Sequence, residues 1–237
     1  MFLDSLVSVL GNSIFRYPAA LEYLHSRNVT DEEIKKYHLG YNKIINVPDD
    51  GSNERKRFME EMWKGKKLEE KIIFPVYDAI GRVVGVIGRP IGVKTFTTFF
   101  LDDTKTTGFF FGFYQALPHI YSSGKAFVVE GSFDCFSFSK VFPNTIATMT
   151  SGMYENQYDL LRFYADRIIT VFDSDKAGDA GRSYVEKKHK VFNPNLEGQR
   201  IFNIDLGYKD PDRCLKVLGF ERFKSLVLRK VNEIILF

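Results

Sequence analysis

Hydrophobic positions near the start of the chain recur at a helical spacing. Pro18 opens a pattern of apolar side chains that continues to Leu24, and proline is well tolerated in the first turn of a helix. Thr30 and Glu33 have the spacing of a capping box, in which each side chain accepts a hydrogen bond from the other residue's backbone N–H. The pattern therefore predicts two short helices within residues 18–39.

The next apolar segments are extended. Residues 71–77 and 82–88 are apolar runs that flank the turn sequence of residues 78–81, which ends in Gly81. Two such runs around a short turn predict a β-hairpin. The threonine-rich residues 94–101 predict a third strand. The first half of the chain is therefore expected to be α+β with antiparallel strands.

After Ser122, Ser123 and Gly124 the pattern changes. Residues 126–130 form a continuous apolar run that ends in a glutamate, which is typical of a strand buried on both faces. Helical stretches then alternate with further strands, and such alternation predicts parallel βαβ units. The strands are expected at residues 126–130, 145–149, 167–172 and 200–205.

These patterns predict two domains. Residues 1–121 are expected to form an α+β domain with antiparallel strands. Residues 122–237 are expected to form an α/β domain, with a mainly parallel sheet, flanking helices and a short C-terminal helix. A chain of 237 residues is long enough to bury one large core or two modest ones.

Composition narrows the function only slightly. The net charge of +3 permits nucleic-acid binding without arguing for it. Cys135 and Cys214 are too few for a zinc ribbon. The first residues lack the basic region of a signal peptide, and no apolar run reaches the roughly 18 residues of a membrane span. We therefore expect a cytoplasmic protein.

Acidic residues follow the predicted parallel strands. Glu130 ends one strand, and Asp173 and Asp175 follow another at a spacing that lets both side chains point to one side. The carboxyl ends of parallel strands meet at one edge of a sheet, where sites usually lie. Carboxylate oxygens are the ligands that Mg²⁺ or Mn²⁺ prefers. The alternative is that the two aspartates merely cap the following helix, where aspartate is favoured.

Glycines accompany these carboxylates. Gly131 is expected to let the backbone approach the site closely, and Gly178 and Gly181 to ease the passage from loop to helix. A third acidic pair, Asp210 and Asp212, follows the last predicted strand.

Several of these segments resemble a known family when they are taken in order. Three of them are similar to the Toprim domain shared by DnaG-type primases, topoisomerases and some nucleases: residues 128–134 (VVEGSFD), 172–178 (FDSDKAG) and 209–212 (KDPD). Four others are similar to the DnaG-type primase core: residues 20–27 (ALEYLHSR), 39–41 (LGY), 73–89 (IFPVYDAIGRVVGVIGR) and 219–223 (GFERF). The resemblance extends over most of the chain.

This resemblance implies roles for particular residues. Glu130, Asp173 and Asp175 would be catalytic metal ligands, with three carboxylates in support: Asp134, Asp210 and Asp212. Three basic residues would bind nucleotide and template phosphates: Arg89, Lys94 and Lys105. Plain surface charge is the alternative for these three.

The resemblance also implies a function. We expect a DNA primase core that copies single-stranded DNA into short RNA primers from ribonucleoside triphosphates with Mg²⁺ or Mn²⁺. A Toprim nuclease and a non-catalytic module that binds single-stranded DNA or a replication partner stay open as alternatives. The family's zinc ribbon and later helical parts are not seen in this sequence. We therefore expect a minimal core, encoded by a phage or plasmid, that works with a replicative helicase or a separate zinc-binding protein. If a phage encodes it, the expected location is the host cytoplasm.

Overall fold

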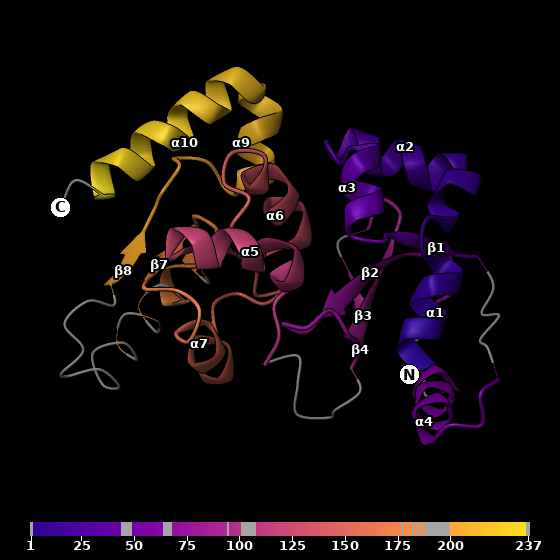
Figure 1. Cartoon of the computed structure of the whole chain (residues 1–237). Coiled ribbons are helices and arrows are strands. Elements are labelled where there is room, and N and C mark those ends of the chain that lie inside the picture. The colour runs from indigo at the N-terminus through magenta and orange to yellow at the C-terminus, as the bar shows by residue number, and fades with distance from the viewer. Residues whose placement is uncertain are drawn as a thin grey trace. The chain divides into compact units, whose positions relative to one another are not determined.

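The computed structural model describes residues 2–43, 49–63, 68–93, 95–100, 108–176, 178–181, 183, 185, 187 and 200–235. The chain divides into two compact units, Met1–Thr106 and Thr107–Phe237 (Figure 1). Helix α5 (Phe113–Ser123) lies within the second unit, where it packs against strands β5 and β6. The domain boundary that the sequence pattern indicates between residues 121 and 122 stays a prediction.

The first unit is built on a four-stranded antiparallel sheet of order β1-β2-β3-β4. The sheet confirms the predicted hairpin and, within the described residues, the third strand. Ile73 of the hairpin lies opposite Gly88, and the register shifts by one residue beside Tyr77. The strands are β1 (Gly40–Asn42), β2 (Lys71–Tyr77), β3 (Val83–Pro90) and β4 (Thr97–Phe100).

Both predicted helices are present as α2 (Pro18–Ser26) and α3 (Asp31–Lys36). The capping box is confirmed as well: Thr30 Oγ1 accepts from the Glu33 N–H at 3.2 Å, and Glu33 Oε2 accepts from the Thr30 N–H at 2.8 Å. The chain also contains a short 3₁₀ helix, η1 (Ser13–Arg16).

Two helices that the pattern did not predict complete this unit, α1 (Phe2–Leu10) and α4 (Asn53–Trp63). The ring of Phe58 lies between those of Phe2 and Phe99, with centroids 5.3 and 4.9 Å away. These rings join both helices to β4 in one hydrophobic core.

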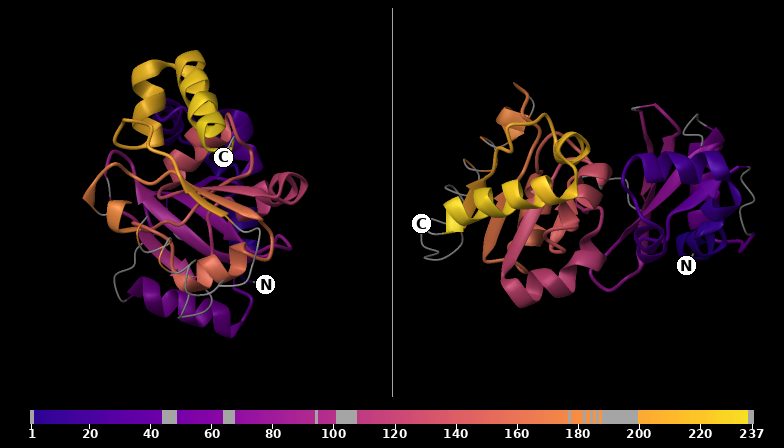
Figure 2. Two further views of the ribbon diagram at one scale, coloured as in Figure 1. Left: turned by 90° about the vertical axis from the view of Figure 1, so that its left-hand side faces the viewer. Right: turned by 90° about the horizontal axis from the view of Figure 1, so that it is seen from above.

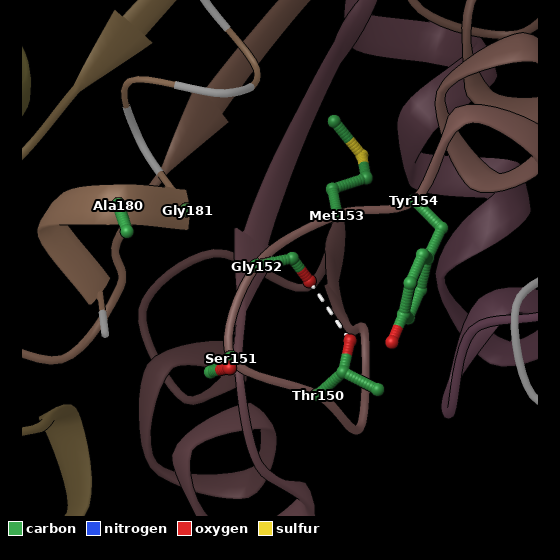
Figure 3. A pocket seen from close by; sticks show the side chains of 7 residues that line it. All are labelled: Thr150, Ser151, Gly152, Met153, Tyr154, Ala180 and Gly181. Atoms are coloured by element: carbon green, nitrogen blue, oxygen red, sulfur yellow. Dashed lines mark hydrogen bonds between the residues drawn. The ribbon is translucent and has the colours of Figure 1, made fainter.

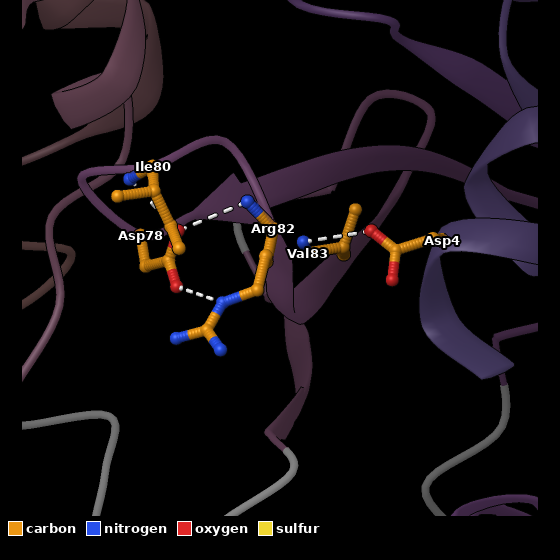
Figure 4. A network of polar contacts seen from close by, with 5 residues as sticks. All are labelled: Asp4, Asp78, Ile80, Arg82 and Val83. Carbon is orange, nitrogen blue, oxygen red and sulfur yellow. Dashed lines mark hydrogen bonds and ion pairs between the residues drawn. The ribbon is translucent and has the colours of Figure 1, made fainter. Parts of the chain in front are cut away.

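The hairpin turn is held by one carboxylate (Figure 4). Asp78 Oδ1 accepts from the backbone N–H groups of Ile80 and Arg82, and its Oδ2 lies 2.7 Å from Arg82 Nε. Partial burial opposes ionisation of Asp78, but the Arg82 N–H, its guanidinium and the Ile80 N–H together lower the pKa of the carboxyl. Gly81 supplies the positive φ of 84° that the turn requires.

The second unit contains the predicted parallel sheet, with strand order β6-β5-β7-β8. Its strands are β5 (Lys125–Val129), β6 (Thr145–Ala147), β7 (Arg167–Thr170) and β8 (Arg200–Asn203). β5 lies between β6 and β7 and is buried from Ala126 to Val129, as expected for a strand covered on both faces.

Right-handed crossovers place successive helices on opposite faces of such a sheet when the strand order reverses direction. Figures 1 and 2 show α6, α9 and α10 on one side of the sheet and α7 on the other. These helices are α6 (Ser132–Ser139), α7 (Glu155–Leu161), α9 (Pro211–Leu218) and α10 (Phe220–Ile235). The predicted fold class, an antiparallel α+β part followed by a mainly parallel α/β part, is confirmed.

None of the helices in the described part of the chain is long and apolar enough to cross a membrane.

We predict that Asp78→Ala destabilises the protein by about 1–2 kcal/mol, because it removes the acceptor of the turn's hydrogen bonds. Thermal unfolding should detect a decrease of several degrees, whereas Glu69→Ala, an exposed acidic residue of the same unit, should leave the midpoint unchanged. Since folding lowers the pKa of Asp78, its contribution is present above the ordinary pKa and is lost as the pH falls through the lowered one. Equal midpoints for Asp78→Ala and wild type at neutral pH would contradict this role.

Candidate metal centre

Glu130 and Asp173 lie together at the carboxyl edge of the parallel sheet. Val128 and Thr170 are partners in the pairing of β5 with β7, so the chain leaves both strands at the same edge. The Asp173 N–H donates to Glu130 Oε1 at 3.1 Å. The two segments, remote in sequence, are therefore in direct contact.

Asp175 lies at the start of the helical segment that follows. Its side chain is exposed, and its Oδ1 accepts from the Gly178 N–H at 3.1 Å. That is the bond of a helix-capping aspartate. The capping role considered from the sequence is therefore present at Asp175, through one of its two oxygens.

Asp134 and Asp212 connect helices α6 and α9 on one side of the sheet. The Asp212 N–H donates to Asp134 Oδ1 at 3.1 Å, and Asp212 is buried while Asp134 is partly buried. Asp210 caps α9 by accepting from the Arg213 N–H at 2.6 Å. Both aspartates of the 210–212 sequence thus have structural bonds at the start of one helix.

The electrostatics of Asp134 reveal how closely the carboxylates gather. Burial, followed by the negative charges of Asp210, Asp173 and Asp212, raises its pKa to about 8, although the Asp212 N–H acts in the opposite direction. Four of the predicted site residues therefore lie within electrostatic reach of one another. Asp134 is protonated at neutral pH when no cation compensates the cluster.

Two lysines lie beside these carboxylates. Lys209 Nζ is 4.0 Å from Asp173 Oδ2, and Lys216 Nζ is 3.1 Å from Asp212 Oδ2. The Ser174 N–H also donates to the Lys209 carbonyl at 2.8 Å, which ties the loop after β7 to the segment before α9. Sequence reasoning gave Lys209 no role, although its place directly before Asp210 was the available signal.

The glycines of the site permit close packing. A Cβ on Gly178 would overlap the carbonyl oxygen of Asp173 and lie 3.1 Å from Glu130 Oε1. A Cβ on Gly131 would lie 2.7 Å from Asp134 Oδ2. The close approach expected at Gly131 is therefore present, and Gly178 permits a similar close approach at the start of the helical segment.

The predicted basic residues lie in the first unit. Arg89 is partly buried on β3, opposite Ile72 in the register. Lys94 and Lys105 lie outside the described residues.

In the described part of the chain, no three or more His, Cys, Asp or Glu side chains form a ready cage for an ion. Mg²⁺ is usually held by only one or two protein carboxylates together with substrate phosphates and water, so an all-protein cage is not needed. The donor set, carboxylate oxygens without a thiolate or imidazole, fits such a hard cation. The ligand roles of Glu130, Asp173 and Asp175 stay a prediction.

Comparison with known proteins shows a family match within the second unit. Residues 127–215 match a family described as Toprim-like. The chain is also 28% identical to a DNA primase of Aquifex aeolicus over 95% of its own length. It spans about half of that primase, 48% of its length.

Solved structures extend the similarity to both units. The DnaG primase catalytic domain bound to single-stranded DNA matches with a TM-score of 0.77 at 21% identity, covering 96% of this chain and 79% of that one. The Aquifex aeolicus primase fragment with zinc-binding and RNA polymerase domains matches with a TM-score of 0.71 at 26% identity, covering 96% of this chain and 59% of that one.

We predict that Gly178→Ala lowers the stability of the protein by about 1–3 kcal/mol, because its methyl group must displace the backbone of Asp173. Denaturant unfolding measures this loss. Gly108→Ala is the matched control, since a Cβ at Gly108 meets no atom within 4 Å. A Gly178→Ala variant as stable as the Gly108→Ala variant would show that the packing is looser than described.

We predict that Asp134→Asn stabilises the metal-free protein, and more so at pH 8 than at pH 5. Folding raises the pKa of Asp134 from 3.8 to about 8, so the folded state retains a proton that the unfolded state loses. Stability of the wild type should therefore fall as the pH rises between these values. Asparagine carries no such charge and can still accept from the Asp212 N–H.

Thermal unfolding in EDTA at the two pH values tests this. The variant should unfold about 3 °C or more above wild type at pH 8. A variant less stable than wild type at both pH values would contradict the carboxylate repulsion.

Proposed function

Because the chain has the sequence likeness and the fold of a DnaG-type primase catalytic core, with a Toprim-like domain at residues 127–215, we propose that it synthesises short RNA primers on single-stranded DNA. The similarity includes the antiparallel first unit as well as the Toprim-like second unit. That coverage favours a primase over a nuclease that shares only the Toprim-like part.

The observation that supports this function most directly is the carboxylate cluster at the carboxyl edge of the parallel sheet. Glu130 contacts the backbone of Asp173, and Asp134 is held protonated by burial and by its acidic neighbours. Such a cluster is electrostatically unfavourable unless a cation joins it. A site of this charge is suited to divalent metal and to the phosphates that accompany the metal.

In the proposed site Glu130, Asp173 and Asp175 hold Mg²⁺ or Mn²⁺, with Asp134, Asp210 and Asp212 in support. When bound, such a metal would neutralise charge at the α-phosphate and would help to orient the attacking 3′-hydroxyl. Pyrophosphate leaves as the new phosphodiester bond forms.

The chain's own residues position this chemistry. Glu130 Oε1 fixes the Asp173 backbone through its N–H, and Gly178 keeps the helix start within reach of both residues. Lys209, half-exposed beside Asp173, adds a positive charge at the edge where the triphosphate would arrive. Catalysis here is mainly positioning and charge neutralisation.

The proposed partners follow from the same likeness. Single-stranded DNA is the proposed template and ribonucleoside triphosphates are the proposed substrates. The proposed location of primer synthesis is the cytoplasm. The Aquifex aeolicus fragment carries a zinc-binding domain beside its RNA polymerase domain. A separate zinc-binding protein or a replicative helicase would supply template selection to this chain.

Contacts of Arg89, Lys94 and Lys105 with phosphates would give binding that depends steeply on salt and little on sequence.

We predict that Asp173→Asn lowers primer synthesis by about 100-fold or more, because it removes a charged ligand worth several kcal/mol in the transition state. The assay incubates the full chain with single-stranded DNA, labelled ribonucleotides and Mg²⁺ or Mn²⁺, and separates the RNA products by length. Asp159→Asn, an aspartate of α7 in the same unit, is the control and should retain activity.

Three results would contradict the proposal. The first is wild-type activity in Asp173→Asn. The second is cleavage of DNA by the wild type without nucleotides, which would identify a nuclease. The third is binding of single-stranded DNA with no RNA product under any metal, which would identify a binding module.

A further inference from the structure

A pocket of about 390 Å³ lies in the second unit, between the loop after β6 and the helical segment after β7 (Figure 3). We propose that it binds the nucleobase and ribose of the nucleotide whose phosphates are held at the carboxylate cluster. The inference rests on the proposed function and names where the rest of the substrate goes. The lining residues are Thr150, Ser151, Gly152, Met153, Tyr154, Ala180 and Gly181.

The pocket is connected to the proposed metal site through both of its walls. Its loop is joined to Glu130 by the Met149 N–H, which donates to the Glu130 carbonyl at 2.8 Å. Its opposite wall, at Ala180 and Gly181, belongs to the helical segment that Asp175 caps. A nucleotide with its phosphates at the carboxylates therefore has this pocket within reach.

The two walls meet backbone to backbone. A Cβ on Gly181 would lie 2.9 Å from the Cα of Gly152, and Gly152 has a φ of 129°, which only glycine adopts readily. The contact bridges the loop after β6 and the segment after β7, the strands on either side of β5. The pocket is thus part of the same sheet edge as Glu130.

The loop is rigidly built, as expected of a binding surface. Gln157 is fully buried, and its Nε2 donates to the carbonyls of Phe109 at 2.7 Å and Thr148 at 3.1 Å. Its Oε1 accepts from the Tyr154 N–H at 3.1 Å. Met149 has a φ of 62°, a strained value for a residue with a side chain. Strain that the surrounding bonds sustain is commonly found at functional sites.

The chemistry of the lining suits a base and a sugar. The walls are mostly apolar, and Ser151 adds a hydroxyl group to the lining. The Tyr154 ring is 47% exposed, and Figure 3 shows it beside Thr150 at the pocket. An aromatic face that is open to solvent can stack any of the four bases. A template-directed enzyme needs such tolerance, because it must accept each nucleotide in turn.

The test compares ATP with inorganic tripolyphosphate, which has the phosphates but no base or ribose. Both are titrated calorimetrically in Mg²⁺ into the full chain and its variants. Tyr154→Ala should weaken ATP binding at least about fivefold, which corresponds to the lower end of the free energy of stacking one base on an aromatic ring. The affinity for tripolyphosphate should stay within about twofold of the wild-type value. Tyr154→Phe should bind ATP as wild type does, because it keeps the ring.

A second variant tests the pocket from its other wall. Ala180→Leu adds volume at an exposed helix position and should exclude the base while tripolyphosphate still binds. Tyr121→Ala, on α5 and 82% exposed, is the control for loss of a surface tyrosine and should leave both affinities unchanged.

Unchanged ATP binding in both Tyr154→Ala and Ala180→Leu would overturn the base pocket while the proposed function stands. Equal weakening of ATP and tripolyphosphate would also overturn it, since the variants would then act on the phosphate site. If wild type binds neither compound in Mg²⁺, the metal–phosphate site of the proposed function fails, and the pocket proposal fails with it.

Discussion

The parallel pairing of β5 with both β6 and β7 is the interaction on which the site depends. It brings together, at one edge, three segments that are far apart in sequence: Glu130, residues 148–154 and Asp173. Two hydrogen bonds then fix them, from the Met149 N–H to the Glu130 carbonyl and from the Asp173 N–H to the Glu130 side chain. The candidate metal centre and the adjoining pocket share these bonds, so neither can be rearranged without the other.

Charge at this edge opposes the stability of the fold. Asp134 remains protonated at neutral pH because it is buried beside Asp210, Asp173 and Asp212. Like charges this close disfavour ionisation of the buried carboxyl. Capping is nevertheless present, since Asp175 and Asp210 each accept a bond from a helix start. The residues to which we assign a metal-binding role in the proposal thus also make structural bonds.

Carboxylates alone do not distinguish the chemistries that a Toprim-like domain supports. A metal held by the same side chains can direct either a water molecule or a sugar hydroxyl at a phosphate. The discriminating feature is the first unit, in which α1 and α4 pack with the antiparallel sheet around Phe58. The sequence match to a DNA primase of Aquifex aeolicus covers 95% of the chain and so includes this unit, which is why we propose primer synthesis and not DNA cleavage.

Elements with local signals could be predicted from the amino-acid pattern. These include the capping box of Thr30 and Glu33, the turn closed by Gly81, and the apolar strand that ends at Glu130. Each of them depends on bonds or side chains within a few residues, so spacing alone predicts it. The same patterns placed Glu130 and Asp173 at strand ends, and parallel pairing followed from the alternation of strands and helices.

Other features depend on neighbours that are remote in the chain, and they are visible only in the folded protein. Helix α1 packs on β3 and Phe58, more than 50 residues away, so its own sequence gave little sign of it. Gly178 leaves room for the Asp173 carbonyl, which a Cβ at this position would overlap. Gln157 donates hydrogen bonds to the carbonyls of Phe109 and Thr148. The raised pKa of Asp134 likewise arises from acidic groups that folding gathers around it. Distances between residues remote in the chain set each of these properties, and a linear pattern does not contain those distances.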